Sequence, residues 1–140
     1  MKILLAVDGS AYTKKMLAYL VTHEDLFSNN NSFTLLTVQP QLPTRARNVV
    51  GKEAADNYYR QESERVLGPA TQFLLRHGID AKTVSKVGHA GEVICKTADT
   101  GKFDMVVMGS HGHGLFGNLV MGSVATQVLS HSKVPVLLVR

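Results

Sequence analysis

The sequence predicts an α/β fold in which helices cover both faces of a doubly wound parallel β-sheet. Short, near-continuous apolar runs alternate with helical patterns along all 140 residues. Alternation of this kind produces a parallel sheet, because each helix carries the chain back to the same end of the sheet. Two of the apolar runs end in turn-forming or glycine-rich segments. Ligands of doubly wound sheets bind beyond such strand ends, where the strand order reverses.

The first half of the chain contains two expected strands and one expected helix. Residues 2–7 form an apolar run that ends in an Asp-Gly-Ser turn, as in a strand buried on both faces. Residues 11–24 carry apolar side chains at helical spacing, and residues 32–38 are the second expected strand. Residues 41–51 have no clear period, so we expect a long loop there.

The second half continues the alternation. A helical pattern spans residues 53–77, and we expect a kink or break at Gly68-Pro69 because proline removes a backbone donor and crowds the preceding turn. The remaining apolar runs predict strands at 81–87, 104–108 and 134–139, and the remaining helical patterns predict helices at 91–100 and 123–130.

The strongest local signal is a glycine-rich segment between the fourth expected strand and the last helix. Its glycines stand at positions 109, 112, 114, 117 and 122. Glycine lets backbone N–H groups approach a phosphate closely, and Ser123 is a natural N-cap for a helix whose first amides favour an anion. The segment therefore predicts phosphate binding, with a loop that binds no ligand as the alternative. The chain has no P-loop pattern GxxxxGK(S/T), and the turn after the first expected strand, where the dinucleotide fingerprint should stand, reads DGSAYT and lacks it.

Composition narrows the function classes further. The net charge is +4, and no Asp or Glu follows Asp104. Residues 105–140 therefore suit an anionic ligand and offer no carboxylate to a metal. The lack of Trp and the few aromatic residues argue against nucleic-acid binding, and no apolar run is long enough for a membrane helix. We expect residues 1–140 to form one domain, because 140 residues is a usual domain length. We expect a cytoplasmic location, because the chain has a single Cys and no leader signature.

The glycine spacing Gly109-x2-Gly112-x9-Gly122-Ser123 resembles the ATP-binding signature of the universal stress protein family. The segments ILLAVDGS, DMVVMGSHG and SKVPVLLVR are also similar to that family. The resemblance implies a five-stranded sheet in the order 3-2-1-4-5, with the reversal between the first and fourth strands. It also implies ATP as the ligand, with Mg²⁺ held mainly by phosphate oxygens.

Carried over by position, the resemblance assigns a candidate site. Its adenosine side is Ala6, Val7, Asp8 and Val38, with Asp8 at the ribose and Val38 at the base, and its phosphate side is Gly109, Gly112, Gly122, Ser123 and Val124. His111 stands where nucleotide-binding members often carry a basic residue. The alternative role of Asp8 is that of a turn-former.

Other polar residues have weaker assignments. Arg45 and Arg47 either fold over the phosphates or face water. His89 and Glu92 begin the helix at 91–100, which the implied strand order puts far from the crevice. A metal site at His111 and His113 is not expected, because no further ligand lies nearby in the sequence.

The resemblance implies an ATP-binding stress-response protein, and we expect a regulatory or signalling dimer with little or no turnover, whose nucleotide-bound state an unidentified protein partner recognises. The glycine loop has no lysine and no evident base, which phosphoryl transfer usually needs. Two alternatives stay open: a slow ATP hydrolase or phosphotransferase in the same crevice, and an interaction module that binds no nucleotide. The dimer is expected through residues 134–139, an uncharged strand at the sheet edge in the implied order.

Overall fold

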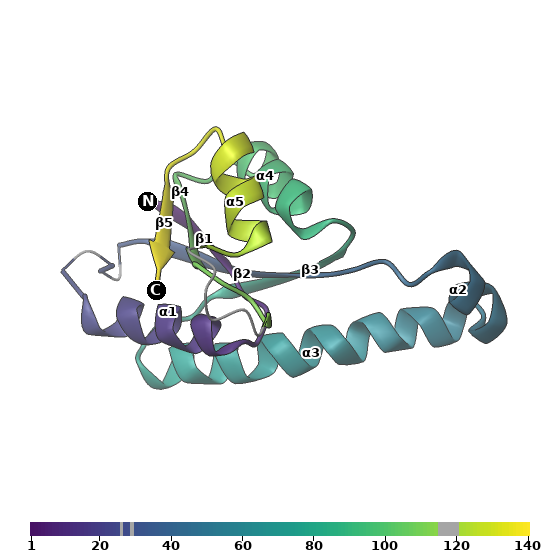
Figure 1. The fold of residues 1–140 in the computed structure, drawn as a ribbon. Coiled ribbons are helices and arrows are strands. Elements are labelled where there is room, and N and C mark those ends of the chain that lie inside the picture. Colours follow the sequence, from purple (N-terminus) through teal and green to yellow (C-terminus); the bar gives the residue numbers. More distant parts are fainter. Residues whose placement is uncertain (26, 29, 115–120) are drawn as a thin grey trace.

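A computed structural model describes residues 1–25, 27–28, 30–114 and 121–140. One parallel sheet forms the centre of the molecule, with the strand order β3-β2-β1-β4-β5 (Figure 1). Its strands are β1 (Lys2–Ala6), β2 (Ser32–Gln39), β3 (Lys82–Val87), β4 (Met105–Gly109) and β5 (Val136–Val139). Both the predicted fold class and the predicted strand order are confirmed.

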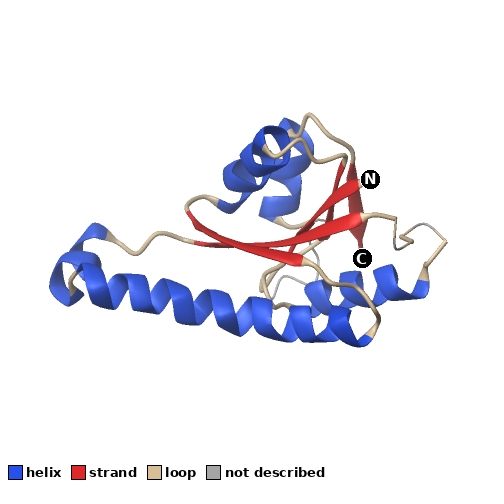
Figure 2. Cartoon of the chain, turned by 180° about the vertical axis from the view of Figure 1, so that it is seen from behind, coloured by secondary structure: helices blue, strands red, loops and turns tan. Residues whose placement is uncertain are grey.

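Helices cover the sheet on both faces. The helices α1 (Ala11–Thr22) and α3 (Lys52–Arg76) pack on one face, and α4 (Ala90–Thr100) and α5 (Ser123–His131) pack on the other (Figures 1 and 2). The strand β1 contributes to both layers, because its side chains alternate: Ile3 and Leu5 pack with α1 and α3, while Leu4 packs with α4 and α5. Burial on both faces explains why this strand reads as a continuous apolar run. No helix in the described ranges is both long and apolar enough to cross a membrane.

One local expectation was wrong, and another was wrong in part. Residues 41–51 are not a loop throughout, because α2 (Thr44–Val50) forms there at the far end of α3 (Figure 2). This short helix buries none of its residues, so it has no apolar period from which to predict it. The helix α3 is not broken at Pro69; it continues through that residue to Arg76. Pro69 and Arg65 are both exposed, so the carbonyl that loses its donor lies on the solvent side, where water can satisfy it.

The sheet brings the ends of β1 and β4 together. Ala6 of β1 lies beside Met108 of β4. From this point the chain after β1 turns towards α1, and the chain after β4 enters the glycine-rich segment. The strand order reverses between these two central strands, and the candidate site lies beyond their carboxyl ends.

Candidate functional site

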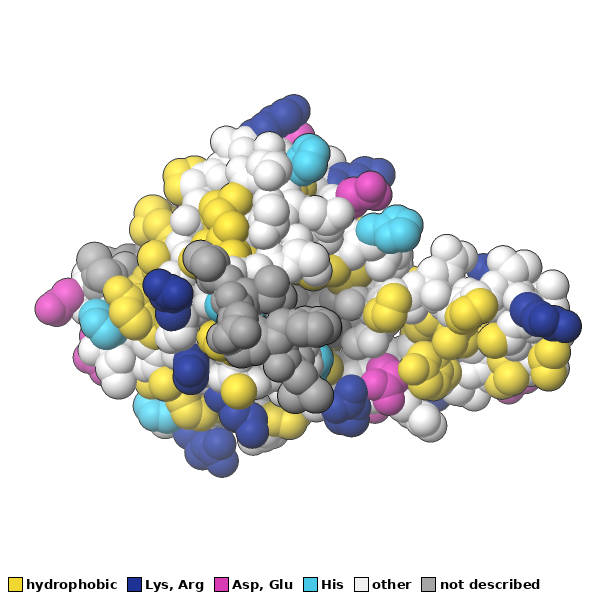
Figure 3. Space-filling view, in the orientation of Figure 1, with side chains coloured by type: hydrophobic (Ala, Val, Ile, Leu, Met, Phe, Trp, Pro, Cys, Tyr) yellow, Lys and Arg dark blue, Asp and Glu magenta, His cyan; other side chains and the backbone are white. Residues whose placement is uncertain are grey.

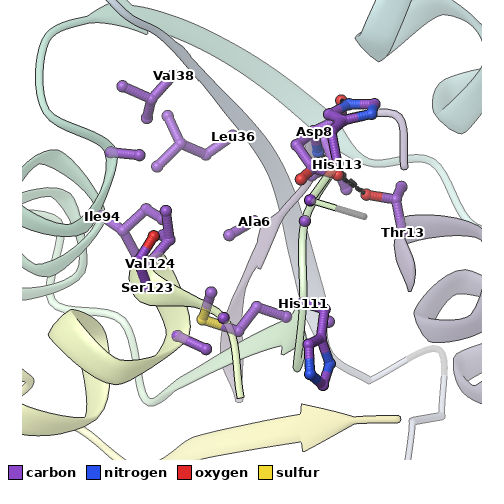
Figure 4. A pocket seen from close by; sticks show the side chains of 18 residues that line it. Ala6, Asp8, Thr13, Leu36, Val38, Ile94, His111, His113, Ser123 and Val124 are labelled. Carbon is purple, nitrogen blue, oxygen red and sulfur yellow. Dashed lines mark hydrogen bonds between the residues drawn. The ribbon is translucent and has the colours of Figure 1, made fainter. Parts of the chain in front are cut away.

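A cavity of about 420 Å³ opens at the carboxyl ends of β1 and β4 (Figure 4). The starts of α4 and α5 form its far wall. All ten predicted site residues line this cavity: Ala6, Val7, Asp8, Val38, Gly109, His111, Gly112, Gly122, Ser123 and Val124. Folding therefore gathers in one place residues that are up to 118 positions apart, between Ala6 and Val124.

One end of the cavity is apolar. Its walls are Leu36 and Val38 of β2, Ala6 of β1, Ile94 of α4 and Val124 of α5 (Figure 4). Leu36 is 1% exposed and belongs to the core between the sheet and the α4–α5 layer. Aliphatic walls of this kind suit the flat faces of an aromatic ring, because they exclude water without competing hydrogen bonds.

The other end presents the first turn of α5. The N-cap of this helix is Gly122, not the predicted Ser123, which is the first helical residue and is exposed. Gly122 has no side chain with which to accept from the first amides, and no side chain in the described ranges caps them. The positive end of the helix dipole is therefore open at the cavity, a suitable arrangement for an anion.

Asp8 forms the turn after β1 and also reaches the cavity. Its Oδ1 accepts from the backbone N–H of Ser10 at 2.9 Å and from the Thr13 hydroxyl at 2.8 Å. Its Oδ2 points to Gly112, since a Cβ built on that glycine would lie 2.9 Å from the oxygen. One carboxylate oxygen thus serves the turn while the other faces the glycine loop, so the two roles considered for Asp8 are compatible.

The glycines of the motif meet different neighbours. A Cβ on Gly109 would lie 2.7 Å from the Cβ of Tyr12, so this glycine lets α1 approach β4. A Cβ on Gly122 would lie 3.1 Å from the Cα of His111 and 3.3 Å from the Ser110 carbonyl oxygen, which accepts from the Gly122 N–H. The contact of Gly112 with Asp8 joins the glycine loop to the end of β1, whereas the contact of Gly122 with His111 lies within the loop, and all four residues line the cavity. Gly117, which also belongs to the predicted phosphate-binding segment, lies outside the described residues.

The two histidines of the loop have local partners. The ring of His111 lies 4.7 Å from the Tyr12 ring, its Nδ1 is 2.8 Å from the Ser110 hydroxyl, and in Figure 4 it points away from Asp8. The Nζ of Lys15 lies over the Tyr12 ring, 4.8 Å from the ring centroid. The Nε2 of His113 lies 2.6 Å from the Asp8 carbonyl oxygen and so ties the loop to the end of β1. Among the described residues, no three His, Cys, Asp or Glu side chains gather as a metal-binding group.

The sequence missed part of the cavity wall. Thr13, Leu36, Ala90, Ile94 and Met108 also line it. The expectation that the helix at 91–100 begins far from the crevice was wrong, because Ala90 and Ile94 stand in its wall. The strand order places β4 next to β1, and the crossover from β3 to β4 carries α4 over the site. The pattern Asp8-x-Ser10-x-x-Thr13, an Asx turn followed by a helix start, is the signal that could have identified Thr13.

Three other residues lie away from this cavity. Arg45 and Arg47 belong to α2, at the far end of α3 (Figure 1), and neither lines the cavity. The thiol of Cys95 is partly buried between α4 and α5, 3.8 Å from the Val128 carbonyl oxygen. Burial raises the pKa of this thiol, which keeps it protonated at neutral pH.

Comparison with known proteins gives a consistent result. The family model described as the universal stress protein family matches residues 1–140. Universal stress protein Slr1230 of Synechocystis sp. is 32% identical over 139 residues, which are 99% of this chain but only 42% of that protein. A universal stress protein of Thermus aquaticus is 28% identical over 99% of this chain and 97% of its own length. The chain thus spans less than half of the Synechocystis relative.

Solved structures share the fold. The protein MJ0577 of Methanocaldococcus jannaschii is 27% identical with a TM-score of 0.80, covering 99% of this chain and 94% of its own. A universal stress protein family protein from Arabidopsis thaliana with AMP bound is 18% identical with a TM-score of 0.71, covering 99% and 90%. The universal stress protein of Archaeoglobus fulgidus in complex with dAMP is 22% identical with a TM-score of 0.66, covering 100% and 98%.

Proposed function

The chain belongs to the universal stress protein family, and from this premise we propose that it binds ATP in the cavity between β1 and β4. The observation that carries the proposal is the joining of two chemistries in one cavity. An apolar slot at Leu36 and Val38 opens towards the helix N-terminus at Ser123, whose first amides no described side chain caps. A nucleotide has the same division, with an aromatic base at one end and phosphates at the other. The AMP and dAMP complexes of structural relatives support an adenine nucleotide as the ligand class.

The proposed pose follows the chemistry of the wall. The base lies against Val38 and Ala6, the ribose hydroxyls donate to Asp8, and the phosphates accept from backbone amides of the glycine loop and of the first turn of α5. Val7, Gly109, Gly112, Gly122 and Val124 complete the assignment. When bound, Mg²⁺ neutralises phosphate charge; Asp8 is the one carboxylate among the described lining residues, so the metal rests mainly on the phosphates.

We propose binding with little or no turnover. Among the described lining residues the titratable side chains are Asp8, His111 and His113. One oxygen of Asp8 and both histidines already hold the loop together through local contacts. Phosphoryl transfer needs a base or water-positioning group and cations at the γ-phosphate; the described lining residues include no Lys or Arg, and their titratable side chains are already engaged in these contacts. A regulatory or signalling role in the cytoplasmic stress response, with a protein partner reading the bound state, fits these contacts better than slow hydrolysis does.

We also propose a homodimer through β5. This strand pairs with β4 on one side only, and its sequence Val-Leu-Leu-Val carries no charge. Residues 136–138 are half-buried and Val139 is buried, and Figure 3 shows apolar side chains at the surface on this side of the molecule. The opposite edge strand, β3, carries Lys82 and Lys86, which are typical protections against edge pairing. A twofold axis beside β5 would pair two copies antiparallel and close the assembly.

Two measurements test the nucleotide proposal. Mass spectrometry of denatured, freshly purified protein should detect adenine nucleotide, and calorimetry on stripped protein should show saturable binding of ATP with Mg²⁺. A turnover assay on the same sample separates binding from hydrolysis. No adenine nucleotide and no heat of binding at millimolar ATP would refute the proposal and favour a nucleotide-free interaction module. Turnover at ordinary enzyme rates would favour the hydrolase instead.

A further inference from the structure

The hydroxyl of Thr13 holds the carboxylate of Asp8 in a closed ring of hydrogen bonds. Thr13 lies in the first turn of α1 and is 5% exposed. Its Oγ1 accepts from the Asp8 backbone N–H at 3.0 Å and donates to Asp8 Oδ1 at 2.8 Å (Figure 4). One hydroxyl therefore contacts both the main chain and the side chain of Asp8, which restricts rotation of the carboxylate about its side-chain bonds.

This ring determines which carboxylate oxygen faces the cavity. Oδ1 is occupied by Thr13 and by the Ser10 N–H, whereas no hydrogen bond from the described residues reaches Oδ2. Oδ2 is the oxygen that lies beside Gly112, and both residues line the cavity. The carboxylate thus presents one oriented acceptor to a ligand and keeps the other for the turn.

Within the described chain, no other side chain donates to this carboxylate. His113 contacts Asp8 through its backbone carbonyl oxygen, not through the carboxylate. The Ser10 side chain is the N-cap of α1 and accepts from the Thr13 N–H at 3.4 Å. Without the Thr13 hydroxyl, the carboxylate would keep a single backbone bond, around which it can turn.

We infer that Thr13 is the positioning residue that aims Asp8 Oδ2 at the ribose hydroxyls and so gives the site a preference for ribonucleotides over deoxyribonucleotides. The inference rests on the proposed function, since it assumes that a nucleotide occupies the cavity. A fixed acceptor discriminates between the two sugars more strongly than a rotating one, because the bond to the 2′-hydroxyl forms without a further loss of side-chain freedom.

The test uses Thr13→Val, which keeps the shape and removes the hydroxyl, and Thr13→Ser as the matched control, which keeps the hydroxyl. Calorimetric titration with ATP and with 2′-deoxy-ATP should show that Thr13→Val weakens ATP by about tenfold and brings the two affinities together. Thr13→Ser should keep both the affinity and the preference within about twofold. In an Asp8→Ala background, Thr13→Val should cause no further loss, because the two residues act as one unit. If Thr13→Val does not fold, Thr13→Ala takes its place.

A measurement without nucleotide separates this inference from the proposed function. The Hα–Hβ coupling constants of Asp8 by NMR should indicate one rotamer in the parent and in Thr13→Ser, and averaging in Thr13→Val. If the parent binds no ATP, the proposed function fails, and averaging in Thr13→Val would still support the positioning of Asp8. A single Asp8 rotamer in Thr13→Val would overturn the inference. So would an unchanged ribose preference, or a further loss in the Asp8→Ala background.

Discussion

Alanine substitutions in the glycine motif should separate its structural glycine from its functional one. Gly109 and Gly112 have backbone conformations open to alanine, since neither φ lies in the left-handed region. Any effect must therefore come from the added methyl group. On Gly109 that methyl would meet the Cβ and backbone of Tyr12 at 2.7–3.2 Å, whereas on Gly112 it would meet the Asp8 carboxylate at 2.9 Å.

The magnitudes follow from what each methyl displaces. To accommodate Gly109→Ala, α1 and β4 must move apart, and overpacking of this kind costs about 1–3 kcal/mol. That cost lowers the Tm by roughly 3–12 °C for a chain of this size. Gly112→Ala displaces only the end of a side chain. Its clash is offset by about 0.4–1 kcal/mol from the lower entropy of the unfolded chain, so the Tm should stay within about 3 °C.

Binding should show the reverse order. Gly112→Ala moves Asp8 Oδ2, and loss of a charge-assisted hydrogen bond of about 1.5–3 kcal/mol weakens ATP by roughly 10- to 150-fold. Gly109→Ala should keep most of its affinity at temperatures where it remains folded. The matched control is Gly68→Ala in α3, where the added Cβ meets nothing within 4 Å; it should raise the Tm by about 2–4 °C without changing affinity.

The assays are calorimetric unfolding without ligand and titration with ATP. The two motif variants should exchange rank between them, with Gly109→Ala the less stable and Gly112→Ala the weaker binder. Native affinity in Gly112→Ala would refute the contact geometry of the site. An unchanged Tm in Gly109→Ala would show that α1 does not depend on this glycine for its approach to β4.

Three further predictions concern single side chains. Asp8→Ala should weaken ATP by roughly 10- to 150-fold and reduce the preference for ribose over deoxyribose; unchanged affinity in calorimetry would remove Asp8 from the site. Replacing the half-buried Leu137 with Lys, and leaving the buried Val139 unchanged, should give a folded monomer or a markedly weaker dimer by light scattering; a parent that is monomeric at micromolar concentration, or a variant that dimerises normally, would contradict the β5 interface. Because burial raises the pKa of the Cys95 thiol, its alkylation by iodoacetamide should accelerate at higher pH than that of free cysteine, and an equal or lower midpoint would show that burial does not control the thiol.

The sequence predicted the parts of this protein that depend on burial within one element. A strand such as β1 packs on both faces, so its whole run is apolar and can be recognised without its neighbours. The helix α2 shows the limit, because a helix that buries nothing leaves no apolar period. The exposed Val49, at 82%, and its neighbour Val50 lie on this helix, where Figure 3 shows apolar side chains at the surface. Pro69 shows the same limit, since its cost depends on which side of α3 faces solvent.

The sequence also predicted ten residues that line the cavity, but it did not predict which neighbour each of them contacts. Glycine spacing indicated a close approach of backbone and did not tell what approaches: Tyr12 at Gly109, and Asp8 at Gly112. The start of α4 enters the cavity wall only because the strand order carries its crossover over β1. Such contacts join residues about 100 positions apart, as in the bond from His113 to Asp8. Local periodicity reports which side of an element is buried, whereas the meeting of two elements depends on the path of the chain between them, which only the tertiary structure decides.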